Sequence, residues 1–168
     1  PPTHPDQLRE HETVSLRYFN IFGPRQDPTS PYSGVLAKFI TQMLAGQPPT
    51  IFGDGKQSRD FTYIDNVVSA NLLAAKAPAA EVAGKVFNIA TGTRFDLNQT
   101  FEILKKIIGF KGSVQYAEER AGDVKHSLAD LSSTEKHLGY KPLVGFEEGL
   151  RRTVEWYRGE QVAAASSE

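Results

Sequence analysis

Residues 51–65 read Ile51-Phe-Gly-Asp-Gly-Lys-Gln-Ser-Arg-Asp-Phe-Thr-Tyr-Ile-Asp65 and place a glycine-punctuated turn between two short apolar segments. Gly53 and Gly55 tolerate positive φ, so the pattern predicts a hairpin. Just beyond the turn, Arg59 offers a planar guanidinium that matches a bound phosphate well. The same pattern is also typical of a surface hairpin whose Arg59 pairs with Asp60. The stretch by itself leaves both interpretations open.

Two amphipathic helices flank this stretch. Apolar side chains recur at helical spacing from Val35 to Leu44 and stop at Gly46, which predicts one helix there. A second helix is expected over residues 65–76, with Asp65 as its N-cap. Its buried face is expected to carry Val68, Leu72 and Ala75.

Further elements alternate between strand and helix along the rest of the chain. Strands are expected over residues 14–19, 86–89 and 114–116, with an extended piece near 127–129. A capping box of Asp96 and Gln99 predicts a helix that carries Leu97, Phe101, Leu104 and Ile108 and stops at Gly109. This alternation predicts an α/β or α+β fold.

The C-terminal part is predicted to hold two more helices. Ser132 and Glu135 form a second capping-box pattern, for a short helix that ends at Gly139. The last helix is striped by Phe146, Leu150, Val154 and Tyr157. Three segments are expected: a loop or disordered start over residues 1–12, one domain over 13–160, and a disordered tail over 161–168.

Composition narrows the class of protein. The chain has 168 residues, 39% of them hydrophobic and 23% charged, which suits one globular domain with a real core. Its formal net charge of -1 argues against a nucleic-acid partner. There is no cysteine, and no apolar run approaches membrane-spanning length. We therefore expect a soluble, cytoplasmic protein without a membrane partner.

The residues that bear chemistry are mostly binders of anions and polyols. Asn20, Arg59, and the pair Arg120 and Asp123 are the candidates. Arginine suits a phosphate oxygen and a carboxylate suits a sugar diol, although a solvated arginine/aspartate turn has the same sequence pattern. The four histidines lack metal-ligand spacing, and no serine lies in a nucleophile elbow, so we predict no metal site and no catalytic residue.

Several short motifs in fixed order resemble one enzyme family. They are Arg17-Tyr-Phe-Asn20, Gly23-Pro-Arg-Gln-Asp-Pro28, Gly53-Asp-Gly55, Ser58-Arg-Asp-Phe61 and Arg120-Ala-Gly-Asp123. In this order they are similar to the extended short-chain dehydrogenase/reductases, and most similar to the NAD-dependent UDP-sugar 4-epimerases. The resemblance spans about residues 13 to 158. It implies the C-terminal, substrate-binding half of such an α/β enzyme, with residues 14–19 and 85–90 as the last strands of a Rossmann sheet.

The resemblance also implies a role for individual residues. Tyr18 and Phe19 would border the nicotinamide of NAD. The other positions would contact a UDP-sugar: Asn20, Arg59 and Arg120 its diphosphate, Ser33, Gly34 and Val35 the uracil edge, Phe52 the base, and Asp123 the ribose. Such enzymes invert C4 through transient oxidation to a 4-ketose, so the nucleotide is held tightly while the hexose is held loosely.

Ser127 resembles a family position that limits substrate size. A small residue there leaves room for an N-acetyl group and a bulky one excludes it. We therefore predict that UDP-N-acetylhexosamines are accepted as well as UDP-hexoses.

Two family features are missing from the 168 residues. There is no glycine-rich phosphate loop, and no tyrosine is followed four positions later by lysine. We therefore expect a parent enzyme whose other half seats NAD, and no epimerisation by this chain alone. Two alternatives stay open: a stand-alone nucleotide-sugar binding or assembly module, and a nucleotide-sugar dehydratase or decarboxylase. Strands without neighbours also predict a homo-oligomer, through pairing of exposed edges.

Overall fold

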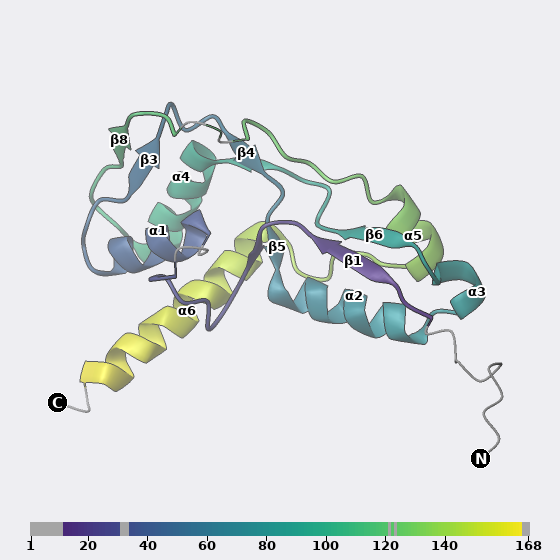
Figure 1. Ribbon diagram of the computed structural model, residues 1–168. Helices are drawn as coiled ribbons and strands as arrows, with labels where there is room; N and C mark the ends of the chain where they lie inside the picture. Colours follow the sequence, from purple (N-terminus) through teal and green to yellow (C-terminus); the bar gives the residue numbers. More distant parts are fainter. Residues whose placement is uncertain (1–11, 31–33, 121, 123, 166–168) are drawn as a thin grey trace, which may run out of the picture.

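The chain folds into two groups of elements that meet at a central junction (Figure 1). The computed structural model describes residues 12–30, 34–120, 122 and 124–165, with side chains described through residue 160. The strands are β1 Ser15–Tyr18, β2 Ile21–Phe22, β3 Thr50–Phe52, β4 Ser58–Arg59, β5 Thr62–Tyr63, β6 Val86–Ile89, β7 Phe95–Asp96 and β8 Gln115–Ala117. The helices are α1 Val35–Leu44, α2 Ile64–Lys76, α3 Ala79–Val82, α4 Leu97–Ile108, α5 Ser132–Leu138 and α6 Phe146–Ala165.

The strands form pairs between segments that are distant in sequence. β1 pairs with β6, β2 with β5 and β3 with β8, all in parallel, while β4 pairs with β7 in antiparallel orientation. The hairpin predicted within residues 51–65 is therefore wrong, because β3 pairs with β8 and β5 pairs with β2. The glycine turn carries the chain from one strand pair to another.

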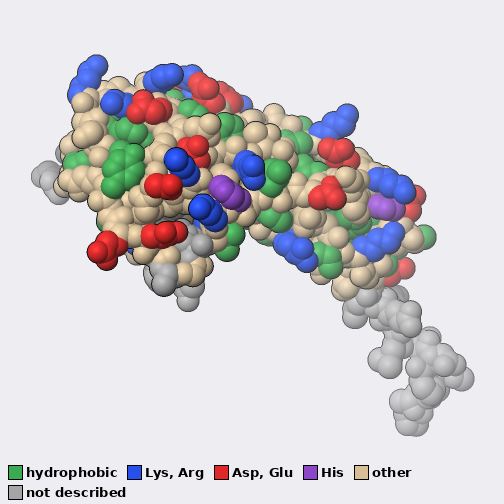
Figure 2. All heavy atoms as spheres, turned by 90° about the horizontal axis from the view of Figure 1, so that it is seen from above, with side chains coloured by type: hydrophobic (Ala, Val, Ile, Leu, Met, Phe, Trp, Pro, Cys, Tyr) green, Lys and Arg blue, Asp and Glu red, His purple; other side chains and the backbone are tan. Residues whose placement is uncertain are grey.

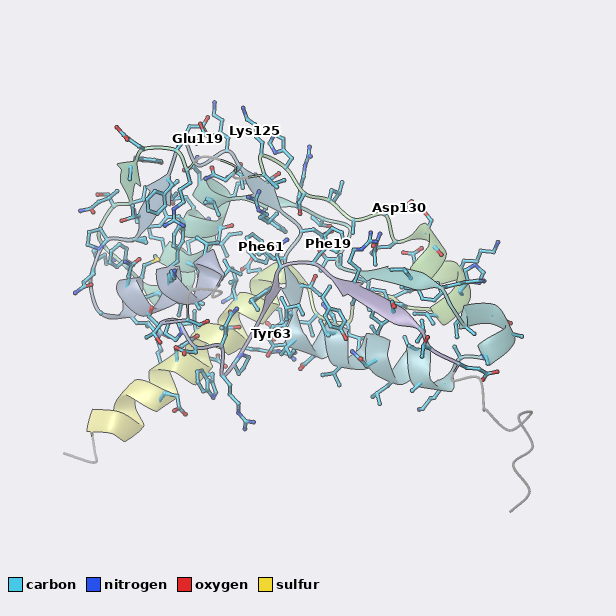
Figure 3. All side chains as sticks on the ribbon, in the orientation of Figure 1. Phe19, Phe61, Tyr63, Glu119, Lys125 and Asp130 are labelled. Atoms are coloured by element: carbon cyan, nitrogen blue, oxygen red, sulfur yellow. The ribbon has the colours of Figure 1, made fainter. Side chains whose placement is uncertain are left out.

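Each group of elements has its own hydrophobic core. The first core lies among α1, α4 and α6, where the predicted stripes are buried, as shown by Phe39, Leu104 and Val154 at 1%, 0% and 0% exposure. The second lies between α2, β6 and α5 and includes Phe87 and Ile89. Phe61 and Phe19 lie near the junction between the two groups (Figure 3).

Helix α2 differs from its prediction at both its start and its buried face. It begins at Ile64 with Tyr63 at the N-cap, so Asp65 lies in the first turn and is not the cap. Val68 and Leu72 are 51% and 56% exposed, and the buried apolar residues are Val67, Ala70 and Ala74. The predicted face was wrong because this helix is apolar on several sides, and only the position of the sheet selects one.

One predicted capping box forms and the other does not. The Asp96 carboxylate accepts from the Gln99 backbone N–H at 2.7 Å, and the Gln99 side chain returns the bond at 3.1 Å. At α5 the N-cap is Leu131, and the Ser132 N–H and hydroxyl both donate to Asp130. These bonds hold the pKa of the Asp130 carboxyl below its usual value.

Helix ends are terminated as expected except at the C-terminus. Gly109 and Gly139 end α4 and α5 in the left-handed conformation, with φ of 77° and 62°. α6 continues to Ala165, so the predicted disordered tail from residue 161 is helical as far as the structure describes it. Residues 1–11 of the predicted disordered start lie outside the described residues. β2, β4, α3 and β7 were not predicted.

Charged side chains of both signs lie on the face of the molecule that Figure 2 shows. On the face above β8, β3 and β4, acidic and basic side chains are intermixed (Figure 2). Among the described residues, no helix is long and apolar enough to cross a membrane.

Candidate nucleotide-sugar site

One pocket of about 220 Å³ lies where α1, β3, β4 and the start of α4 meet. Six of the residues predicted to bind substrate line it: Asn20, Gly34, Val35, Phe52, Arg59 and Arg120. These residues come from five separate segments, so only the tertiary structure brings them together. The pocket therefore combines an aromatic ring, two guanidinium groups and a helix N-terminus.

The glycine turn is fixed by contacts to the start of α4. The backbone N–H groups of Leu97 and Asn98 donate to the Gly55 carbonyl at 3.0 and 3.2 Å. A side chain at position 55 would meet Asn98 at 2.3 Å, and φ of 75° also favours glycine there. Across the turn, the Gln57 amide donates to the Phe52 carbonyl at 2.6 Å. Phe52 and Arg59 are thus held at opposite ends of a rigid loop.

Asp60 joins the segments behind the pocket. Its side chain is fully buried, and one oxygen accepts from the Thr91 N–H and hydroxyl at 2.9 and 2.7 Å. The other oxygen accepts from the Gly92 N–H at 3.0 Å and the Ala129 N–H at 3.3 Å. The carboxylate therefore accepts four hydrogen bonds. These bonds tie residues 91–92 and Ala129 to the segment that carries Arg59.

Asn20 has the backbone and side-chain geometry of a fixed site residue. Its φ is 36°, a left-handed conformation uncommon for a residue other than glycine. Its Nδ2 donates to the Asp60 carbonyl at 3.1 Å and lies 3.5 Å from the Ser127 hydroxyl. If Nδ2 binds a phosphate, as predicted from the sequence, the phosphate would compete with the 3.5 Å contact to Ser127.

The two arginines are held differently. The Arg59 guanidinium donates to the Ser58 carbonyl at 3.0 Å and reaches the Lys125 carbonyl at 3.5 Å. The Arg120 guanidinium lies over the Phe52 ring, 3.8 Å from its centroid. Backbone carbonyls thus hold Arg59, while Arg120 stacks on the aromatic ring that was predicted to contact the base.

The remaining predicted positions lie elsewhere. The Tyr18 ring is 43% exposed and its hydroxyl bonds to Asn71 on α2, while neither Tyr18 nor Phe19 lines the pocket. Ser127 contacts Asn20 beside the pocket without lining it. Ser33 and Asp123 lie outside the described residues.

The sequence did not single out several polar residues of the site. Gln26, Thr50 and Gln57 also line the pocket. Behind it, the buried Ser58 hydroxyl contacts Nδ1 of the exposed His126 at 2.9 Å. No local pattern marks these residues as part of a site, because the pocket forms only when segments distant in sequence come together. Within the described ranges, no group of three or more His, Cys, Asp or Glu side chains could hold a metal ion.

Comparison with known proteins assigns the family. Residues 7–90 match the model of the NAD dependent epimerase/dehydratase family. The chain belongs to this family. The α/β fold class predicted from the sequence, with the terminal strands of a Rossmann sheet, is confirmed by the solved structures that it resembles.

Two of these structures are UDP-sugar epimerases. The UDP-glucose 4-epimerase of Thermotoga maritima, solved with UDP-glucose, is 44% identical, with a TM-score of 0.82 over 87% of this chain and 46% of that one. The UDP-N-acetylglucosamine 4-epimerase of Methanobrevibacter ruminantium, solved with UDP-N-acetylmuramic acid, is 45% identical, with a TM-score of 0.82 over 89% and 47%.

A curated relative with the same chemistry is the UDP-glucuronate 4-epimerase of Thermodesulfobacterium geofontis. It is 37% identical over 142 residues, which are 84% of this chain and 42% of that protein. The chain thus spans less than half the length of the relatives it matches.

Proposed function

We propose that this chain forms the UDP-sugar-binding part of an NAD-dependent UDP-sugar 4-epimerase. The observation that carries the proposal is the convergence of Arg59, Arg120 and Phe52 on one pocket. Guanidinium groups suit a diphosphate, and charge-assisted bonds are worth about 1.5–3 kcal/mol each. An aromatic ring offers a flat apolar face to a base. One of the two solved relatives holds UDP-glucose and the other holds UDP-N-acetylmuramic acid.

The pocket suits the chemistry of C4 inversion because it anchors the part of the substrate that does not react. A hexose that must turn between oxidation and reduction cannot be gripped firmly. Binding energy from the remote nucleotide keeps such a sugar in the site. We assign this anchoring to Arg59, Arg120, Asn20 and Phe52, with Gly34 and Val35 presenting the N-terminus of α1 to the uracil edge.

We infer that NAD has its main seat outside the described residues. Tyr18 and Phe19 border at most the nicotinamide, and the Tyr18 hydroxyl is already bonded to Asn71. The glycine loop and the Tyr-x-x-x-Lys pair are absent from the 168 residues. We therefore assign hydride and proton transfer to groups outside these residues, and no catalytic residue to this chain.

Binding and turnover can be tested separately. Isothermal titration of the chain with UDP should show binding, weakened at least tenfold in Arg59→Ala through loss of one charge-assisted bond. Incubation with UDP-glucose and NAD should give no UDP-galactose above the blank. No binding of UDP would refute the proposal, and product formation would refute the inactivity of the chain.

Ser127 provides a test of substrate size in the full-length enzyme. Ser127→Tyr should reduce turnover of UDP-N-acetylglucosamine more than turnover of UDP-glucose, because the added ring fills space beside Asn20. Unchanged N-acetyl turnover would contradict the assignment.

The alternative is a stand-alone binding or assembly module of the same ligand class. The open edge of β1 bears on both possibilities, because β1 pairs only with β6 among the described strands. We infer that this edge pairs with a second copy or with a complementary half. Light scattering that shows a monomer over a wide concentration range would contradict self-association. A dehydratase or decarboxylase would be distinguished by product analysis of the full-length protein.

A further inference from the structure

Phe52 lines two hollows on the surface. One is the main pocket, and the second, of about 160 Å³, is lined by Phe52, Gly53, Asp54, Gln57, Glu119 and Lys125. Glu119 and Lys125 lie close together along the edge above β3 and β4 (Figure 3). Arg120 lines only the main pocket. Its guanidinium lies over the Phe52 ring, 3.8 Å from the centroid, and lines the main pocket together with that ring.

Among the described residues, the Arg120 guanidinium contacts the Phe52 ring and donates no hydrogen bond. In the part of the chain that the structure describes, its stacking on Phe52 is its one recorded interaction. A cation over an aromatic face at an exposed site is attracted only weakly. A phosphate would offer charge-assisted bonds that are several times stronger. A diphosphate that enters the pocket can therefore draw the Arg120 guanidinium away from the Phe52 ring.

We propose that Arg120 and the nucleobase compete for the same face of Phe52, and that the diphosphate resolves the competition by drawing Arg120 off the ring. This inference rests on the proposed function and goes beyond it. Arg120 would hinder the binding of a nucleoside, because it covers the ring, and would favour the binding of a nucleotide, because it contacts the phosphate. Arg120 thereby selects for phosphorylated ligands twice, by rejecting the nucleoside and by binding the phosphate.

The competition predicts effects of opposite sign for two ligands. Uridine must displace Arg120 without offering it a phosphate, so Arg120→Ala should bind uridine about 2- to 5-fold more tightly. In the same variant UDP loses a charge-assisted contact. It recovers only the smaller free energy that wild type spends on displacing Arg120 from the ring. Its affinity should therefore fall at least about twofold.

The experiment titrates wild type, Arg120→Ala and Arg151→Ala with uridine and with UDP, using ligand-observed NMR for the weaker ligand and calorimetry for UDP. Arg151 lies on α6, pairs with Glu147 and does not line the pocket, so its replacement controls for loss of one positive charge. It should leave both affinities unchanged. Equal melting temperatures of wild type and Arg120→Ala would show that folding is unaffected.

Each outcome separates the two proposals. If wild type binds UDP and Arg120→Ala gains affinity for uridine while losing affinity for UDP, the competition is supported. If wild type binds UDP but Arg120→Ala leaves uridine unchanged or weakens it, the base does not displace Arg120 and the inference fails while the proposed function stands. If wild type does not bind UDP, the proposed function itself fails.

Discussion

Replacing Asp60 with asparagine tests how strongly its carboxylate joins the segments behind the pocket. The two Oδ atoms accept four donors, two on each oxygen, at 2.7–3.3 Å. In one orientation the amide NH2 of asparagine would face the N–H groups of Gly92 and Ala129. In the other orientation the NH2 would face the N–H and the hydroxyl of Thr91. The hydroxyl can rotate and accept a hydrogen bond from the NH2, but the N–H loses its acceptor. Either orientation loses at least one backbone bond at a buried site.

The expected cost follows from these contacts. Charge-assisted bonds contribute about 1.5–3 kcal/mol and neutral ones about 0.5–1.5, so losing one bond and weakening the others should lower the free energy of unfolding by roughly 2–4 kcal/mol. Urea denaturation followed by tryptophan fluorescence measures this as a lower midpoint at constant slope. UDP affinity should also fall where the variant remains folded, because Arg59 and Phe61, which flank Asp60, both line the pocket.

Asp130→Asn is a matched control. Its two recorded bonds, from the Ser132 N–H and hydroxyl, fall on one oxygen, so an asparagine can keep both. Asp130 is also exposed, unlike Asp60. A loss of less than about 1 kcal/mol in Asp60→Asn, or an equal loss in the two variants, would refute the argument.

Three further variants probe the packing around the site. The Thr62 hydroxyl is buried and has no hydrogen-bond partner among the described residues, so Thr62→Val should raise the free energy of unfolding by about 1 kcal/mol; a lower urea midpoint would count against this. Gly149→Ala would place a Cβ 2.9 Å from two aromatic side chains, and we expect its melting temperature to fall by several degrees; an unchanged melting curve would show that α6 can shift. Burial, and then the charge of Asp60, raise the pKa of Tyr140 to about 12 from 10.0. Because the folded state holds this proton more tightly, its stabilisation is complete below pH 10 and is lost as the pH rises toward 12, by roughly 2 kcal/mol. Tyr140→Phe, which also removes the 2.8 Å bond to the Ala90 carbonyl, should show a shallower loss of stability over that interval, and parallel pH curves would contradict the assignment.

Local signals were sufficient for much of the helical structure. The stripes of α1, α4 and α6 repeat every 3.6 residues and were predicted correctly. The capping box at Asp96 and the left-handed glycines at 109 and 139 involve only neighbours in the chain. The motif order was likewise sufficient for the family, which the comparison confirmed.

The partners of the strands and the contacts of the site required the tertiary structure. A strand can satisfy its backbone groups with any available edge, so nothing local shows that β3 pairs with β8 rather than with β4. The buried side of α2 depends on where the sheet lies, since that helix is apolar on several sides.

The site shows the same division. The sequence determined which residue types are present, including the arginines, the aromatic ring and the glycines of the turn. Only the tertiary structure placed Asp60 among donors that are 31 to 69 residues away, and laid Arg120 on Phe52. These contacts depend on distances between segments, which short-range periodicity and propensity do not encode.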